Sequence, residues 1–159
     1  MLIKGIEVED FVNYKKPAMF ISTGTCNWKC CTEAGIPTDV CQNSSLAQLP
    51  FTEVEDDILI NLYMENPITE AIVFGGLEPF EFFGDLYSFI SDFRDYSDDD
   101  VVIYTGFNKD EIIDMVKLLS LYDNIIIKFG RFVPDQEKHY DEVLGVELAS
   151  DNQYAEKIS

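Results

Sequence analysis

The stretch TEAIVFGGLEPFEFFGDLYSFISDFRDYSDDDVVIYT, residues 69–105, decides the fold class. It opens with a short apolar run, Thr69–Phe74, which predicts a buried strand ending at two glycines. Apolar residues at helical spacing then predict an amphipathic helix over 85–96. The apolar positions of this helix are Leu86, Phe89, Ile90 and Phe93. A second apolar run, Val101–Thr105, predicts another strand, so the stretch forms a βαβ unit with parallel strands.

The same alternation continues before this stretch. Pro17–Ser22 is a short apolar run followed by a Thr-Gly-Thr loop, which predicts a strand. Residues 52–65 predict a helix, because Thr52 and Glu55 have the spacing of a capping box. The apolar face of this helix is predicted from the spacing of Val54, Ile58 and Leu62.

The alternation also continues after it. Asn108 and Glu111 again have cap spacing, and they predict a helix over 108–121. Its apolar stripe is Ile112, Val116 and Leu119. Residues 124–129 predict a further strand, and a short strand is expected near 143–148. Together these elements predict one α/β domain over 1–159, with a mostly parallel sheet.

Composition and charge exclude several classes of function. Eleven Lys and Arg against thirty Asp and Glu leave a net charge of -19, which would repel nucleic-acid backbones and anionic lipid surfaces. No apolar run approaches the roughly 20 residues that span a bilayer, and the start MLIKGIEVEDF lacks the features of a signal peptide. We therefore expect a cytoplasmic protein that binds neither nucleic acid nor membrane.

All four cysteines, Cys26, Cys30, Cys31 and Cys41, fall in one short segment directly after the first predicted strand. In α/β sheets ligands bind beyond the carboxyl ends of the strands, so this segment lies where a site is expected. In a reducing compartment clustered thiols act as metal ligands or redox groups. Adjacent Cys30 and Cys31 point in different directions in most backbones. We expect Cys26, Cys30 and Cys41 to be the ligands, with Cys31 as a substitute for Cys30.

Three thiolates on a four-iron cluster leave one iron open to a substrate or cofactor, whereas electron-transfer clusters are usually closed by four. A structural zinc site built from all four cysteines is the main alternative. Zinc sites usually place two CxxC-like pairs apart, and this chain has no such pair. The spacing therefore favours an open 4Fe-4S cluster.

The segment from Gly24 to Cys30, followed by Cys41-Gln42-Asn43, resembles the cluster loop of the radical S-adenosylmethionine (SAM) superfamily. It is most similar to the loop of the activating proteins of anaerobic ribonucleotide reductase. The superfamily spacing is cysteine, three residues, cysteine, two residues, cysteine. This chain keeps the first interval, has Glu33 at the third position, and reaches Cys41 after an expanded loop. The cluster loop implied by this resemblance spans 23–44.

Further motifs carry the resemblance along the chain. Gly75-Gly76-Leu77-Glu78-Pro79 resembles the Gly-Gly-Glu-Pro motif with one inserted residue, and its glycines allow a ligand to approach the backbone closely. Thr105-Gly106-Phe107, the segment 128–132 and Asn152-Gln153 resemble later motifs, and the order of all five agrees. Lys128 and Arg131 could neutralise the SAM carboxylate or pair with local acids.

The resemblance implies a fold, a chemistry and partners. The fold would be a partial, open (β/α)6-type barrel. SAM would bind the open iron, near the residues Gly75, Gly76, Glu78, Pro79, Thr105, Lys128 and Arg131. Reductive cleavage would give methionine and a 5'-deoxyadenosyl radical, which in the activating proteins abstracts hydrogen from a glycine of a partner enzyme. The implied partners are a glycyl-radical enzyme and a flavodoxin- or ferredoxin-type reductant. A radical SAM enzyme acting on a small molecule or peptide, and a non-catalytic iron–sulfur or zinc module, stay open as alternatives.

Overall fold

A seven-stranded sheet forms the centre of the molecule in a computed structural model that describes all residues, Met1–Ser159. The strand order is β3-β1-β2-β4-β5-β6-β9. The four middle strands, β2 (Ala18–Thr23), β4 (Ala71–Gly76), β5 (Asp100–Tyr104) and β6 (Ile125–Phe129), are parallel. All four were predicted from their apolar runs, and the fold is the expected α/β class with a mostly parallel sheet.

The outer strands are antiparallel to their neighbours. β1 (Leu2–Asp10) pairs with β2, β3 (Thr52–Glu53) pairs with β1, and β9 (Tyr154–Lys157) closes the other side against β6. A separate hairpin joins β7 (His139–Asp141) to β8 (Val146–Leu148), which is the short strand expected near 143–148. Strands β1, β3, β7 and β9 were not predicted, because none contains an apolar run like those of the middle strands.

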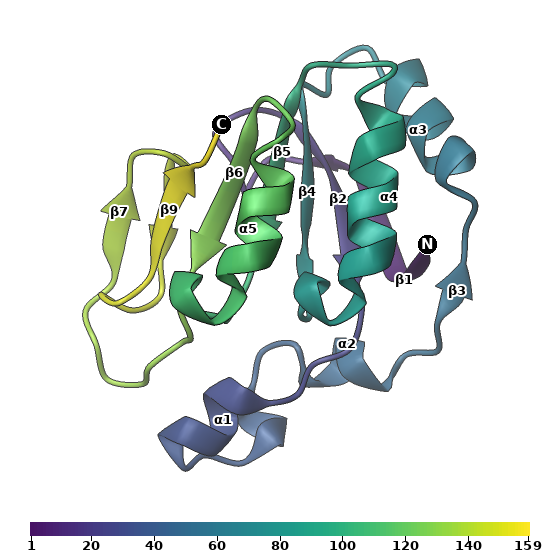
Figure 1. Cartoon of the computed structure of the whole chain (residues 1–159). Coiled ribbons are helices and arrows are strands. Elements are labelled where there is room, and N and C mark those ends of the chain that lie inside the picture. The colour runs from purple at the N-terminus through teal and green to yellow at the C-terminus, as the bar shows by residue number, and fades with distance from the viewer.

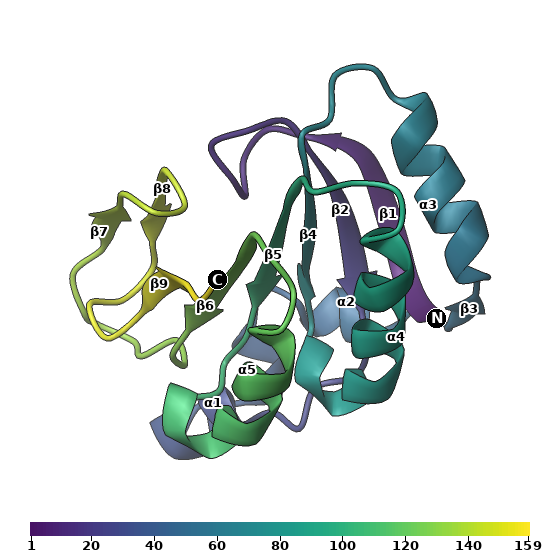
Figure 2. The same cartoon turned by 45° about the horizontal axis from the view of Figure 1, so that its top comes forward.

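Three helices cover one face of the sheet (Figures 1 and 2). They are α3 (Asp56–Glu65), α4 (Phe83–Phe93) and α5 (Ile113–Leu119), with short 3-10 turns η2 (Pro79–Phe82) and η3 (Lys109–Ile112) leading into the last two. The stripes predicted for α4 and α5 are buried in the main hydrophobic core, as expected from their periodicity.

Helix α3 differs from its prediction. It begins at Asp56, because Thr52 and Glu53 are extended and pair with β1 instead of capping a helix. Its buried residues are Leu59, Ile60 and Tyr63, whereas Ile58 is exposed. Pairing of 52–53 at the sheet edge moves the start of the helix and rotates the face that packs on the core.

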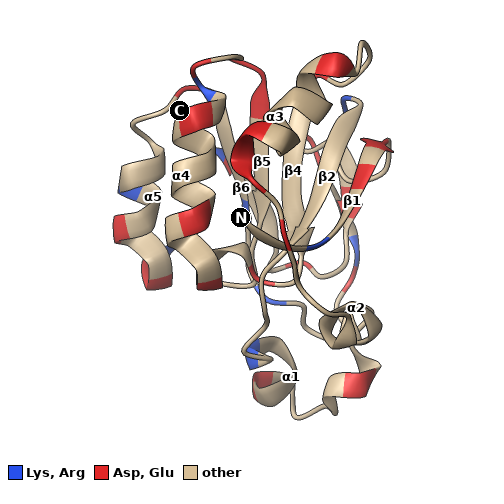
Figure 3. Cartoon of the chain, turned by 90° about the vertical axis from the view of Figure 1, so that its right-hand side faces the viewer, with Lys and Arg blue, Asp and Glu red and all other residues tan.

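The opposite face of the sheet has no helix. It is covered by the loop that carries Tyr14 and by the β7–β8 hairpin, which buries Leu144 and Leu148. None of the helices combines the length and apolar character needed to cross a membrane. Figure 3 shows acidic residues along α3, α4 and α5, consistent with the strongly negative charge of the chain.

The carboxyl ends of the parallel strands meet at one edge of the sheet. Directly beyond this edge lies the cysteine segment, residues 23–44, with the short helix α1 (Lys29–Ala34), the 3-10 turn η1 (Thr38–Val40) and the first residue of α2 (Ser44–Gln48). In Figure 1, α1 and α2 lie below the lower ends of the parallel strands, outside the layers formed by the sheet and helices α3, α4 and α5. The fold thus puts all four cysteines at the edge where α/β proteins bind ligands.

Candidate iron–sulfur site

The two main sequence motifs meet at the carboxyl edge of the sheet. Thr25, at the start of the cysteine segment, forms an isolated β-bridge with Glu78 of the Gly-Gly-Leu-Glu-Pro turn. The Glu78 backbone N–H donates to the Thr25 carbonyl at 2.8 Å. Strands β2 and β4 are parallel neighbours, so segments that follow them along the chain emerge side by side. The site is therefore shared by the cysteine segment and the turn after β4.

Glu78 is the centre of a buried hydrogen-bond network that reaches a third strand. Its carboxylate accepts from the Thr105 hydroxyl at 2.7 Å, from the Gly106 N–H at 2.8 Å and from the Phe80 N–H at 3.2 Å. Burial raises the pKa of this carboxyl, although all three donors favour the charged form. Glu78 thereby joins the ends of β4 and β5, which carry two of the predicted motifs.

Two glycines in these motifs are required by close contacts. Gly76 has φ +81°, and a Cβ there would lie 2.7 Å from the Leu46 side chain of α2. Gly106 has no positive φ, but a Cβ there would lie 3.1 Å from the Cys30 sulfur. These two positions are glycine because the Leu46 side chain and the Cys30 sulfur pack directly against their backbone.

All four cysteines are free thiols. Cys26 and Cys30 line the same small cavity of about 20 Å³, together with Glu78, Gly106 and Arg131. Cys31 is buried, and the nearby Cys41 thiol contributes to its raised pKa. No three side chains of Cys, His, Asp or Glu stand close enough in this structure to hold one metal ion. The structure thus brings Cys26 and Cys30 together, and Cys41 next to Cys31.

Burial disfavours the thiolate forms of Cys26 and Cys30. Burial raises the pKa of Cys26 to about 11, although the Trp28 N–H donates to its sulfur at 3.3 Å. Burial also raises the pKa of Cys30, partly offset by a Phe132 N–H, Lys128 and Arg131. Thiolates are the form that binds iron, so metal binding here must release protons. Free thiols gathered beside backbone donors and cations have the donor chemistry that an iron–sulfur cluster requires.

The two cations predicted at the end of β6 are both buried. The Lys128 ammonium donates to the Gly130 carbonyl at 2.8 Å, and burial lowers its pKa to about 8. The Arg131 guanidinium donates to both carboxylate oxygens of Glu111, at 2.7 and 2.6 Å, and lies 3.0 Å from Glu33. Arg131 therefore pairs with local acids, one of the two roles considered for it.

Glu33 and Glu111 are the site neighbours that sequence reasoning did not assign to the site. Glu33 stands at the position of the expected third cysteine, and Glu111 had cap spacing with Asn108. The Glu111 carboxylate accepts the Asn108 N–H at 2.9 Å, as the cap spacing predicted. Nothing in the spacing could show that the same carboxylate also binds Arg131, because the two residues come from different βα units.

A larger cleft of about 390 Å³ opens beside Cys26. Its walls are the cysteine segment, α2 and the turn after β4, and its lining includes Thr25, Trp28, Asp39, Gln48 and Leu77. The lining is mixed, with hydroxyl, amide and carboxylate groups beside an indole ring. A small polar molecule or a peptide segment could reach Cys26 through this cleft.

A family model described as a 4Fe-4S single cluster domain matches residues 18–154. The match covers the cysteine segment and every strand that contributes to the site. No curated protein matches the chain, and no solved structure does.

Proposed function

Since the chain belongs to the family of 4Fe-4S single cluster domains, we propose that it is a radical SAM enzyme, which cleaves SAM reductively at its iron–sulfur cluster. One observation carries this proposal. The cysteine segment and the Gly-Gly-Leu-Glu-Pro turn, far apart in the sequence, are joined by the bridge between Thr25 and Glu78. The turn that resembles the SAM-binding motif of this superfamily therefore lies beside the cysteines that would hold the cluster.

The ligands proposed for the cluster are Cys26, Cys30 and Cys41, with Cys31 as the substitute for Cys30. A cluster held by three thiolates would supply an open iron and one electron for cleavage of the SAM sulfonium. The protein would hold SAM against the backbone of Gly75, Gly76 and Pro79. Glu78 and Thr105 would fix the ends of the strands, and the Lys128 cation would contribute a positive charge to the site. These residues would orient bound SAM and shield it from water.

The proposed substrate is a glycine of a partner enzyme, as in the activating proteins of anaerobic ribonucleotide reductase. The chain has little structure beyond the sheet and its helices, so a large partner could close the exposed side of the site. The sheet would then serve as the partial, open barrel of this superfamily, and a flavodoxin- or ferredoxin-type protein in the cytoplasm would deliver the electron.

The cleft of about 390 Å³ favours a second candidate, a radical SAM enzyme acting on a small molecule or peptide. It lies directly beside Cys26, and its volume falls within the range of small-ligand sites. The two candidates share the cluster and the SAM site and differ only in the substrate.

The test is anaerobic reconstitution with iron and sulfide, followed by SAM and a strong reductant. We expect methionine and 5'-deoxyadenosine, and loss of both products in Cys26→Ala. A chain that holds a full cluster but forms no 5'-deoxyadenosine would be a non-catalytic module, and the proposal would be wrong. A glycine-centred radical signal on mixing with a glycyl-radical enzyme would separate the first candidate from the second.

The ligand set has its own test. Cys30→Ala should lose most of the bound iron, whereas Cys31→Ala should keep it. If Cys31→Ala lost the iron and Cys30→Ala kept it, Cys31 would be the second ligand. Iron and sulfide per chain, measured after gel filtration, give the answer without any activity assay.

A further inference from the structure

Helix α1, which carries Cys30 and Cys31, has little of its own to hold it in place. It is six residues long, its N-cap Trp28 makes no side-chain capping bond, and Cys31 is its one buried residue. Isolated helices of this length are unstable in water, and apolar burial of a single small side chain adds little. Another interaction must therefore fix α1 against the edge of the sheet.

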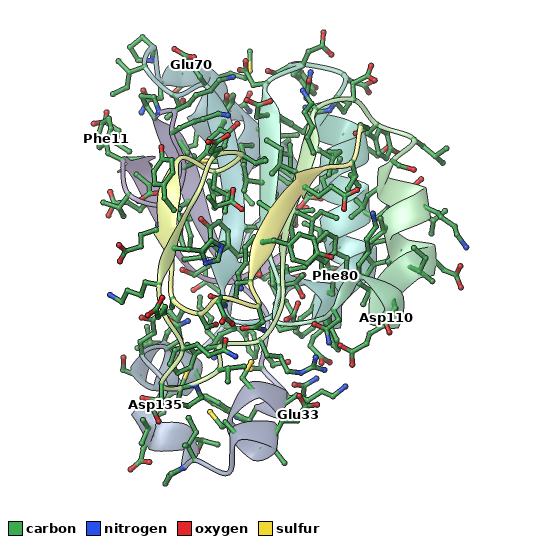
Figure 4. The ribbon with its side chains drawn as sticks, turned by 90° about the vertical axis from the view of Figure 1, so that its left-hand side faces the viewer. Phe11, Glu33, Glu70, Phe80, Asp110 and Asp135 are labelled. Carbon is green, nitrogen blue, oxygen red and sulfur yellow. The ribbon has the colours of Figure 1, made fainter.

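The Asn27 amide, just before α1, donates to Glu81 at 2.7 Å, and four charged side chains add a larger set of contacts. Lys29 and Glu33, one turn apart on α1, face Glu111 of η3 and Arg131 after β6. The Lys29 ammonium pairs with Glu111 and lies 3.9 Å from Glu33, while the Arg131 guanidinium lies 3.0 Å from Glu33 and binds Glu111 through two hydrogen bonds. In Figure 4 Glu33 lies on the segment beyond the strand ends, on the side where sulfur atoms also appear.

Arg131 and Glu111, the two of these charged residues that lie outside α1, are fixed in place by further hydrogen bonds. The Arg131 side chain is 7% exposed, and its backbone carbonyl accepts the Asn152 amide at 2.9 Å. Gln153 donates to the Gly130 carbonyl at 3.3 Å, which fixes the turn before Arg131. Glu111 accepts the Asn108 N–H that starts η3. The pairs on α1 thus connect a weakly supported helix to a rigid frame.

Arg131 also lies beside Cys30. Both residues line the same small cavity; burial raises the pKa of the Cys30 thiol, and the positive charge of Arg131 offsets part of that rise. Glu33 occupies the position where the resembled motif has its third cysteine. Because Cys41 takes the place of that cysteine, position 33 can carry a charged residue that forms an ion pair.

We propose that Lys29, Glu33, Glu111 and Arg131 form a charge latch, which holds α1 against the sheet edge and positions Cys30 before iron binds. Arg131 is then a positioning residue for a cluster ligand. The proposal rests on the proposed function only in taking Cys30 as a ligand. Without the latch α1 separates from the edge, the partly exposed Cys30 becomes more accessible, and the cysteine segment becomes ordered only when iron binds.

The test is alkylation of the iron-free full chain by iodoacetamide, with the modification of Cys30 followed by peptide mass spectrometry. Arg131→Met should raise the alkylation rate of Cys30 by about tenfold or more, because a largely buried ion pair loses one partner. Loss of a nearby positive charge by itself would slow alkylation, since it disfavours the thiolate. An increase therefore reports release of α1 and not a change in thiol reactivity.

The matched control is Glu156→Gln. It removes the pair between Lys109 of η3 and Glu156 of β9, which measures 2.7 Å and whose side chains are 34% and 41% exposed. Cys30 alkylation in this variant should stay within about twofold of the parent, because the pair involves no residue of α1 and partly exposed pairs contribute little. Arg131→Lys, which keeps the charge but loses the two-bond geometry, should fall between the parent and Arg131→Met.

Lys29→Gln provides a second test of the latch in case the Arg131 variants fail to fold. Lys29 is 42% exposed, so its loss leaves the core intact, and it should raise Cys30 alkylation in the same direction by a smaller factor. A folded Arg131→Met or Lys29→Gln chain whose Cys30 reacts no faster than the parent would overturn the latch. Because the assay uses no iron and no SAM, failure of the radical chemistry would leave this result unaffected.

Discussion

Replacing Gly106 by alanine would place a methyl carbon 3.1 Å from the sulfur of Cys30 and 3.6 Å from a carboxylate oxygen of Glu78. Gly106 has an ordinary backbone conformation, so alanine adds contact without backbone strain. Comfortable contacts between heavy atoms begin at about 3.5 Å, and the sulfur must therefore retreat by about 0.4 Å or more. The rest of the turn is held by Glu78 and cannot move as easily.

The stability cost should be small and the effect on the cluster large. Overpacking costs about 1–3 kcal/mol, and we expect about 1 kcal/mol here, because α1 can shift at the surface. Ligands must stand within about 0.5 Å of their productive positions, and a displacement of about 0.4 Å uses most of that tolerance. Positioning changes around metal sites typically weaken binding by about 10–100-fold, so iron should leave the Gly106→Ala chain about tenfold faster when a chelator is added.

The assay is the loss of the iron–sulfur absorbance with a chelator under anaerobic conditions, alongside urea unfolding of the iron-free chain. Gly84→Ala is the control, because a Cβ at Gly84 meets nothing within 4 Å and alanine favours the helix by up to about 1 kcal/mol. If Gly106→Ala retained iron as long as the parent and Gly84→Ala, the sulfur of Cys30 would not depend on this turn, and the reasoning would be refuted.

Three further outcomes are expected. Glu78→Gln exchanges one carboxylate acceptor for an NH₂ group and leaves one of its three donors unpaired, which should cost about 1–3 kcal/mol in urea unfolding; a cost near zero would contradict the network. The Arg131 guanidinium holds the pKa of Glu111 at about 2, below its usual 4.5, so the stability it contributes is fully present above about pH 4.5 and declines as the pH falls toward 2. The difference in unfolding free energy between the parent and Glu111→Gln should therefore shrink over this range, and a difference independent of pH would argue against the pairing. Removing iron from the reconstituted chain should lower its melting temperature, since iron binds the folded cysteine segment more tightly than the unfolded chain; equal melting temperatures would mean that the cluster is not held by the folded site.

Much of the fold could be predicted because its signals are local. The middle strands are apolar runs, and the stripes of α4 and α5 recur at helical spacing, so each can be found within one window of sequence. The outer strands β1, β3 and β9 have no such apolar run. They are strands because a neighbouring strand offers hydrogen bonds, which is information that no local window contains.

The sequence by itself determined the donor chemistry, because four cysteines lie in one segment. It also determined the alternation of strands and helices along the chain, which puts this segment at the carboxyl edge of a parallel sheet. Only the tertiary structure decided which side chains surround the sulfurs. Glu78 joins Thr105 across two strands, and Arg131 pairs with Glu33 and Glu111 from separate βα units. Hydrogen bonds and ion pairs act over a few ångströms, and these contacts, between residues 20 to 98 positions apart, exist only once the sheet has brought its strand ends together.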